Sequence, residues 1–415
     1  MKNIFTCLLA AFLTQSIIAQ PYNIVIKGGH VIDPKNSIDA VMDIGIRDGK
    51  IAIVNKNVDT IGALQVVNAR GMIVTPGLID IHSHNFTGTE ENHYLSNGFS
   101  ALAPDGFTFR VGVTTVVDAG GAGWKSFSLF KKNIIDHSQT RVLSMLNIVG
   151  EGMRGSPYEQ DTRGMDGKMT SLVAKANPAY VVGVKVAHFE GSEWTPVDRA
   201  VEAGTLAKIP VMIDFGSSNP PLSLEELLMK HLRPGDIFTH CFGQVRGRET
   251  IVDTATGKVK QYVKDARQKG VIFDVGYGGI SFAYSQALPA LRDGFYPNSI
   301  STDIHTGSMN NAMKDILSVM SKFLNMGMPL PEVIKASTWS PAQIIQKPEL
   351  GNLSPGSEAD IAVFSMHSGR FGFYDYTGVK TVGEKKLECE MTLRAGRIVY
   401  DLNGIATPVY PIQVR

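Results

Sequence analysis

Two histidines one residue apart, His82 and His84, close an apolar run in the segment TPGLIDIHSHNFTG, residues 75–88. In an extended strand alternate side chains share a face, so both imidazoles and the carboxylate of Asp80 point the same way. Imidazole is a common ligand of zinc and other divalent transition metals. The segment therefore indicates a metal site. The alternative is a set of polar core residues that neighbouring groups satisfy.

Further polar residues stand near the ends of later apolar runs. They are Lys185 in YVVGVKVAH, Asp214 in IPVMIDFG, His240 in DIFTHCF and Asp303 in NSISTDIH. Each alone has an ordinary structural explanation, such as a lysine that reaches solvent or an aspartate that caps a helix. Together, at matching positions in successive runs, they favour a metal site.

Two divalent cations would suit this set of residues. We expect His82, His84 and Asp303 to hold one cation, and His240 with Asp214 to help hold the second. A lysine ammonium cannot ligate a cation. Burial lowers the pKa of a lysine, however, and a free Lys185 amine that reacts with carbon dioxide becomes an anionic carbamate able to bridge two metals.

The runs that carry these residues alternate with helix-like stretches. The expected strands are 77–84, 113–120, 142–149, 180–188, 209–216, 236–242, 271–278 and 298–305, and the expected helices between them are 126–137, 195–208, 223–232, 261–269, 282–293 and 310–325. This order predicts an α/β fold with a (β/α)8 barrel of the TIM type, whose strands all open on one face. A doubly wound open sheet is the alternative.

At both ends of the chain, short strand-like runs follow one another with turns between them instead of helix-like stretches. Asp48-Gly49 and Ala395-Gly396 are typical of tight hairpins between strands. We predict a small β-sandwich domain built from residues 20–75 and 351–415, with the barrel inserted between them at 76–350.

The first residues, MKNIFTCLLAAFLTQSIIAQ, have the pattern of a signal peptide over 1–19. Lys2 precedes a short apolar stretch, and cleavage after Ala19 fits the small residue there. A retained anchor or a frayed helix is the alternative. We expect a secreted or periplasmic protein with no membrane attachment after cleavage. The two cysteines that remain, Cys241 and Cys389, are expected to be free thiols.

Charge and composition exclude some classes of partner. The chain has 40 basic and 39 acidic residues, a net charge of +1, and therefore no electrostatic case for nucleic acid. A small-molecule substrate is expected instead. A homo-oligomer is compatible with the sequence.

These segments resemble the amidohydrolase superfamily. The resemblance rests on PGLIDIHSH, the barrel lysine, THCFG, STDIHTGSMN and the closing WSPAQIIQKPELGNLSPGSEADIAVF, and it covers essentially the mature chain. The sequence is similar above all to the amidohydrolase/deacetylase branch, which includes proteins similar to D-aminoacylases and dihydroorotases. The resemblance implies a metal-dependent hydrolase that deacetylates N-acyl amino acids or acetylated hydroxy acids.

The resemblance also implies roles for single residues. His82 and His84 match the ligands of the first strand, Lys185 the carboxylated bridging lysine, and His240 the ligand of the sixth strand. Asp303 matches the aspartate that ligates one metal and acts as general base. Two positions depart from the branch: Asp214 stands where histidine is usual, and Tyr277 stands in DVGYGG where a histidine is expected.

The implied mechanism uses one or two divalent cations, zinc first, with manganese or iron as alternatives. A metal-activated water attacks the scissile carbonyl, and Asp303 takes its proton. Arg154 and Tyr277 are expected to contact the substrate, Arg154 through a carboxylate. The alternatives are hydrolysis of a cyclic amide or a dipeptide, a deaminase, which Lys185 argues against, and a barrel that binds ligand without catalysis.

Overall fold

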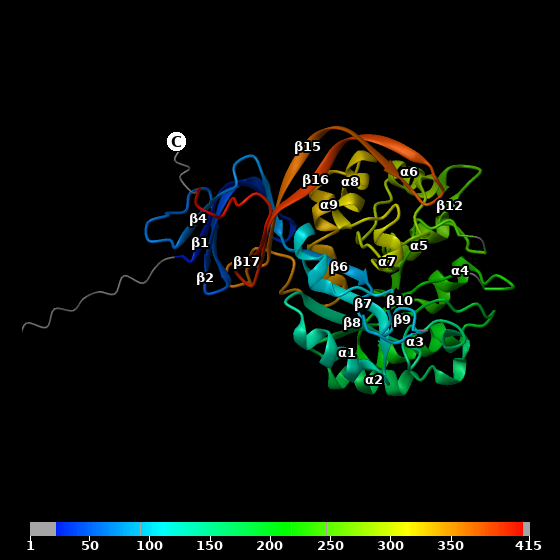
Figure 1. Ribbon diagram of the computed structural model, residues 1–415. Coiled ribbons are helices and arrows are strands. Elements are labelled where there is room, and N and C mark those ends of the chain that lie inside the picture. The colour runs from blue at the N-terminus through cyan, green and yellow to red at the C-terminus, as the bar shows by residue number, and fades with distance from the viewer. Residues whose placement is uncertain (1–21, 92, 217, 246, 410–415) are drawn as a thin grey trace, which may run out of the picture.

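The computed structural model describes residues 22–409 except 92, 217 and 246 (Figure 1). The predicted signal peptide, residues 1–19, lies outside these residues. In the described part of the chain, no helix combines the length and the apolar character that crossing a membrane requires.

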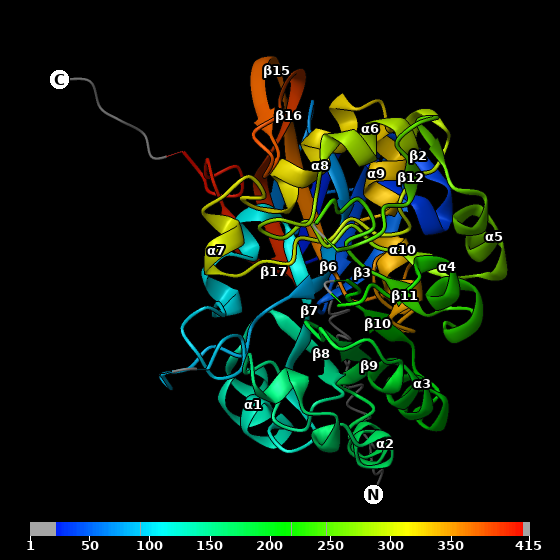
Figure 2. The same ribbon diagram turned by 90° about the vertical axis from the view of Figure 1, so that its right-hand side faces the viewer.

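A curled sheet of parallel strands lies at the centre of one half of the molecule (Figures 1 and 2). Its order is β14-β11-β10-β9-β8-β7-β6. The strands are β6 (Leu78–Ser83), β7 (Val113–Gly123), β8 (Arg141–Asn147), β9 (Val181–Val186), β10 (Val211–Ile213), β11 (Ile237–Phe238) and β14 (Ile272–Phe273). Every residue of β6, β7 and β9 is buried, which explains why these strands appear as continuous apolar runs rather than alternating ones.

The eighth expected strand, 298–305, is not a regular strand. This segment makes isolated parallel bridges, from Ser299 to Asp274 after β14 and from Ile304 to Ser83 in β6. It therefore contacts both edges of the sheet. In an open sheet the two edges lie far apart, and one short segment could not contact both. The segment cannot stay extended because Asp303 has a φ of 52°, in the left-handed region.

Helices follow most of these strands and lie outside the sheet (Figure 2). They are α1 (Phe127–Asn133), α2 (Gly167–Ala176), α3 (Thr195–Ala207), α4 (Leu224–Glu226), α5 (Gln261–Lys269), α6 (Tyr284–Arg292), α7 (Thr306–Met309), α8 (Ile316–Asn325), α9 (Leu330–Lys335) and α10 (Trp339–Ile344). In α3, Val197, Ala200 and Ala203 are buried at helical spacing, which turns one face towards β9 and β10. Helices α2, α7, α9 and α10 were not predicted from the sequence.

A second, mixed sheet contains strands from both ends of the chain. Its order is β17-β16-β15-β5-β1-β2-β3, and β4 also pairs with β1. The strands are β1 (Ile24–Asp33), β2 (Ile38–Arg47), β3 (Lys50–Asn55), β4 (Gln65–Asn68), β5 (Ile73–Pro76), β15 (Ile361–Tyr374), β16 (Lys380–Arg394) and β17 (Arg397–Asp401). The predicted sandwich of two sheets is not confirmed, because these strands share one sheet. The predicted domain boundaries stay predictions.

Both expected hairpins are confirmed. Asp48 and Gly49 have φ values of 52° and 75° between β2 and β3, and Ala395 and Gly396 have 51° and 73° between β16 and β17. Positive φ at both central residues matches the twist of the flanking strands.

The hairpin of β15 and β16 extends beyond the mixed sheet and arches over α8 (Figure 1). Asn325 at the end of α8 accepts a hydrogen bond from the Glu384 amide at 2.9 Å. At the hairpin tip, the Asp375 carboxylate accepts a hydrogen bond from the Tyr284 amide at 2.8 Å, and the Tyr376 hydroxyl donates to the Gln244 carbonyl. The C-terminal part of the chain therefore supports loops that follow strands of the parallel sheet.

Candidate metal centre

Three ligand atoms from distant parts of the chain meet at the carboxyl ends of the parallel strands. His82 lies near the end of β6, His240 follows β11, and Asp303 lies in the segment that bridges both sheet edges. The ligand atoms of these residues all lie within 4.8 Å of one another. Two ligands of a tetrahedral zinc ion, with bonds of about 2.1 Å, are about 3.4 Å apart. A small contraction would therefore place the three around one ion.

His84 contacts this group through Asp303. Its Nε2 atom lies 2.7 Å from Asp303 Oδ1, and the same oxygen lies 3.5 Å from His82 Nε2. The Nδ1 atom of His84 is buried and has no hydrogen-bond partner among the described residues. The structure thus places the three residues predicted for the first cation together, although His84 is outside the group of three ligand atoms.

Hydrogen bonds orient both histidines of the group. His82 Nδ1 lies 2.9 Å from the hydroxyl of Thr239, which donates to Asp274 at 2.7 Å. His240 Nδ1 lies 2.5 Å from the carbonyl oxygen of Gly276. A histidine held at Nδ1 presents Nε2 to a metal. Asp274 was not predicted as part of the site, and its only signal in the sequence was a carboxylate inside the apolar run VIFDVG.

The environment sets the protonation states of two ligands. Burial lowers the pKa of His82 to about 3, and the positive charge of Lys185 adds to this effect. Burial opposes ionisation of Asp303, but His82 and His84 outweigh it and hold the pKa of Asp303 far below its usual value. Metal ligation requires a neutral imidazole and an ionised carboxylate. Both groups are therefore in the state that a cation needs.

Lys185 lies in the interior beside the group. Its Nζ atom is 3.0 Å from His82 Nε2 and 3.6 Å from the sulfur of Met212. Burial lowers the pKa of Lys185, although Asp214 and Asp303 oppose the shift. A buried amine with a lowered pKa is the form that reacts with carbon dioxide.

Asp214 lies at the end of β10, as predicted, but its partners include a residue that the sequence analysis missed. Its Oδ2 atom lies 3.5 Å from His240 Nε2 and 3.8 Å from His188 Nε2. Its Oδ1 atom accepts a hydrogen bond from Nη2 of Arg248. Burial opposes ionisation, yet His240 and Arg248 hold the pKa of Asp214 well below its usual value. No signal in the sequence links Arg248, in a loop, to this carboxylate.

Three residues of this region have an unusual backbone conformation. His188, His240 and Asp303 have φ values of 55°, 56° and 52°. The left-handed region is sparsely populated by residues other than glycine, and such positions cluster at active sites and ligand clamps. The strand ends therefore turn sharply where they present these side chains.

The two predicted substrate contacts differ in their placement. The guanidinium of Arg154 lies 4.0 Å from the centre of the Tyr158 ring, and its Nε atom is buried without a partner among the described residues. Tyr277 is only 1% exposed. Its hydroxyl accepts a hydrogen bond from Lys322 at 2.6 Å and donates to the Tyr374 carbonyl at 3.2 Å. The Tyr277 side chain is therefore held by contacts within the core, and its expected contact with the substrate stays a prediction.

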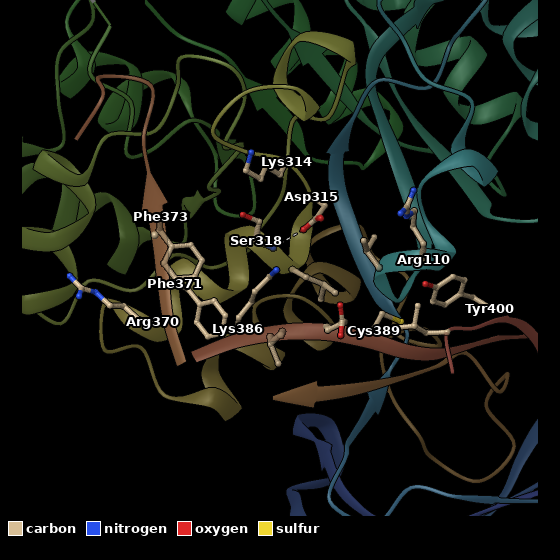
Figure 3. A pocket seen from close by; sticks show the side chains of 16 residues that line it. Arg110, Lys314, Asp315, Ser318, Arg370, Phe371, Phe373, Lys386, Cys389 and Tyr400 are labelled. Atoms are coloured by element: carbon tan, nitrogen blue, oxygen red, sulfur yellow. Dashed lines mark hydrogen bonds between the residues drawn. The ribbon is translucent and has the colours of Figure 1, made fainter. Parts of the chain in front are cut away.

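A separate hollow lies beside the β15–β16 hairpin. The cavity has a volume of about 490 Å³ and lies between this hairpin, helix α8 and the turn at Arg110 (Figure 3). Four cationic and two acidic side chains line it: Arg110, Lys314, Arg370, Lys386, Asp315 and Glu388. Neither the histidines of the candidate centre nor Asp303 line this cavity, so it is not part of that centre.

The sequence of this chain is similar to those of known proteins. Residues 280–399 match the family model described as "Amidohydrolase family". The chain is 32% identical over 336 residues to a deacetylase of Brucella anthropi, a match that covers 79% of this chain and 80% of the relative.

Solved structures resemble the fold over nearly the whole chain. One, described as an adenine deaminase, has a TM-score of 0.81 and 29% identity, and the match covers 92% of this chain and 100% of that one. Another, described as a dihydroorotase, has a TM-score of 0.79 and 27% identity, with coverage of 91% and 99%.

Proposed function

The chain belongs to the amidohydrolase family, and on that premise we propose that it removes an acetyl group from N-acyl amino acids or acetylated hydroxy acids with the help of a divalent metal. The family and the deacetylase relative make it a hydrolase of carbon–nitrogen bonds. The observation that carries the finer proposal is the group formed by His82, His240 and Asp303.

The residues present fit a divalent cation. The group combines two imidazoles with one carboxylate, a donor set suited to zinc, manganese or iron. His84 adds an imidazole at the edge of the group: its Nε2 atom lies 2.7 Å from Asp303 Oδ1, and its buried Nδ1 atom lacks a partner among the described residues. Zinc is our first choice of metal, because it accepts this mixture in a tetrahedral site with one open position.

The reaction needs a nucleophile and a route for its proton. A bound divalent metal would supply acidity to water and polarise the scissile carbonyl. Asp303 is ionised and lies beside His82 and His84, so it can take the proton from the attacking water. It then passes this proton to the leaving nitrogen or oxygen, which completes the hydrolysis.

Carboxylation of Lys185 is part of the proposal. Its buried Nζ atom lies beside a ligand atom of His82, where a carbamate would replace a positive charge by a negative one. The added charge would favour a cation. The mass of the intact protein under native conditions, and a carbamate signal after exchange with ¹³C-bicarbonate, test this step.

A second candidate function is the hydrolysis of a cyclic amide. The likeness to a structure described as a dihydroorotase favours it, because that likeness covers nearly the whole chain at 27% identity. The same centre would serve both reactions, since each begins with attack of water on an amide carbonyl.

The test is acetate release from a panel of N-acetyl amino acids and O-acetyl hydroxy acids by metal-loaded protein. The Asp303→Asn protein with equal metal content is the matched comparison. Acetate release by the native protein and its loss in the variant would support deacetylation. Opening of cyclic amides without acetate release would favour the second candidate. A metal-loaded native protein that hydrolyses neither class would contradict both.

Export also belongs to the proposal. Residues 1–19 would be removed, so the mature protein would begin at Gln20, and the mass of protein recovered from producing cells tests this. The contact of Arg154 with a substrate carboxylate stays a prediction from the sequence; its buried Nε atom has no partner among the described residues. Formation of a homo-oligomer is an open part of the proposal that sedimentation analysis decides.

A further inference from the structure

Arg248 is a buried cation beside the candidate centre that the proposed reaction does not use. Its side chain is 8% exposed and forms an ion pair with Asp214, which is 11% exposed. The same carboxylate lies 3.5 Å from His240 Nε2. Only the carboxylate of Asp214 therefore separates the permanent positive charge of Arg248 from His240, a residue of the metal group.

Two glycines make room for this guanidinium. A Cβ atom at Gly216, after β10, would lie 2.5 Å from Arg248 Nε, and one at Gly243, after β11, would lie 3.1 Å from Arg248 Nη1. The first contact is closer than packed atoms tolerate, and the second is tighter than most packed contacts. A larger residue at Gly216 would displace the guanidinium, and one at Gly243 would crowd it.

The guanidinium has donors to spare. Only Nη2 is paired with Asp214, whereas Nε and Nη1 are buried and have no hydrogen-bond partner among the described residues. A buried charged donor without an acceptor is costly in free energy, and such groups in native proteins normally find a partner. A carboxylate is the acceptor that best matches a guanidinium.

The ion pair with Arg248 also limits the ability of Asp214 to ligate a metal ion. One of its oxygens is engaged by Arg248, and the fixed positive charge would repel a dication placed between Asp214 and His240.

We infer that Arg248 takes the place of a second metal ion: it engages Asp214 through Nη2 and offers Nη1, on the neighbouring edge of the guanidinium, to the carboxylate of the substrate, beside a centre that holds one divalent cation. This inference rests on the proposed function for the chemistry of the substrate. It identifies Arg248, rather than Arg154, as the residue that selects an anionic substrate.

The first experiment measures metal content per chain by inductively coupled plasma mass spectrometry after dialysis against excess zinc. We expect one zinc in the native protein and a rise towards two in Arg248→Met, because Asp214 is released. Arg163→Met is the matched control, since that arginine is 90% exposed. Two zinc ions in the native protein, or no rise in Arg248→Met, would overturn the replacement of a metal.

The second experiment measures binding of N-acetylglycine and of its neutral amide, N-acetylglycinamide, by calorimetry on the Asp303→Asn protein. Adding Arg248→Met should weaken binding of the acid about 10- to 100-fold, as expected for loss of a charge-assisted pair, and leave the amide unchanged. An equal loss for both ligands, or no loss, would overturn the anion role. Arg154→Met on the same background shows whether that arginine holds the carboxylate instead, which would also contradict the inference.

A third variant guards against a folding defect. Arg248→Lys keeps the charge but not the planar donors, so we expect one zinc per chain with weakened binding of the acid. The outcome also separates the two proposals. Deacetylation with an unchanged KM in Arg248→Met would refute the inference alone. Binding of the acid that depends on Arg248, without any hydrolysis by the native protein, would refute the proposed function alone.

Discussion

Asp303 Oδ1 lies 2.7 Å from His84 Nε2 although 219 positions separate the two residues in the sequence. The contact joins the first strand of the parallel sheet to the segment that bridges its two edges. It places Asp303 Oδ1, an oxygen of an ionised carboxylate, beside His82 in β6 and His84 directly after β6.

Replacing Asp303 by asparagine should lower turnover by about 10²- to 10⁴-fold, the usual contribution of a positioned general base. The asparagine side chain keeps the volume and a hydrogen-bonding oxygen, so the fold should persist. Steady-state kinetics and circular dichroism on the same preparation check this. A native rate in a variant with normal metal content would remove Asp303 from the proton route.

Removing the metal should abolish activity and lower the melting temperature. A ligand that binds only the folded chain stabilises it by about 4 kcal/mol when its concentration is 1,000 times its dissociation constant. Dialysis against a chelator, then readdition of zinc, manganese or iron, should show loss and recovery in calorimetry. His240→Ala should lose metal, while His367→Ala, whose side chain is 47% exposed, should retain it. Equal metal content in both variants would contradict the assignment of His240.

Gly276→Ala should disturb the orientation of both histidines. The added Cβ would lie 2.3 Å from Thr239 Oγ1 and 2.9 Å from Nδ1 of both His82 and His240, at a φ of 45°. Lower metal affinity and a loss of about 1–3 kcal/mol in the free energy of unfolding are expected. The control is Gly279→Ala, where a Cβ meets nothing within 4 Å. If both variants bind metal as the native protein does, the orienting role of this backbone is wrong.

The stability of the protein should rise with pH above neutrality because of Lys322. Burial lowers the pKa of Lys322 from 10.5 to about 7, so between these values the unfolded chain binds a proton that the folded chain releases. The free energy of unfolding then increases with pH, by at most about 1.4 kcal/mol per pH unit from this group. Urea unfolding between about pH 7 and 9 should show a flatter dependence in Lys322→Met.

The exposed Lys168→Met variant serves as the control for Lys322 and should keep the native slope. Lys322 also donates hydrogen bonds to Tyr277 and Ala312, both at 2.6 Å. Their loss should lower the stability of Lys322→Met by an amount that does not vary with pH. The slope, rather than the stability itself, is therefore the quantity that decides. An unchanged slope would show that the Lys322 amine stays protonated in the folded chain.

The positions of the apolar runs along the chain were sufficient to predict most strands of the parallel sheet. Continuous apolar runs mark strands that are buried on both faces, and His82, His240 and Asp303 each follow or close such a run. Pairing between strands of the two chain ends was beyond this reasoning, because alternation shows which face is buried and not which strand is the neighbour. For this reason the sequence predicted a sandwich of two sheets, whereas the strands of both chain ends share one mixed sheet.

The parts of the site that sequence reasoning missed depend on contacts between distant loops. Nothing in VRGRE indicates that Arg248 turns back to Asp214, since a loop arginine is ordinarily a solvated residue. The packing of Tyr277 was equally beyond the sequence. The glycines on both sides of it approach site atoms, whereas its own side chain turns into the core.

The position of β5 between β1 and β15 has a consequence for how the protein is made. The ribosome releases β1 and β5 early, but the partner on the other side of β5 emerges only after nearly the whole chain has been synthesised. Until then β5 keeps an unpaired edge, a surface prone to wrong pairing with other chains. A nascent or prematurely terminated chain that ends before Ile361 thus cannot complete this sheet, however well its parallel strands have folded.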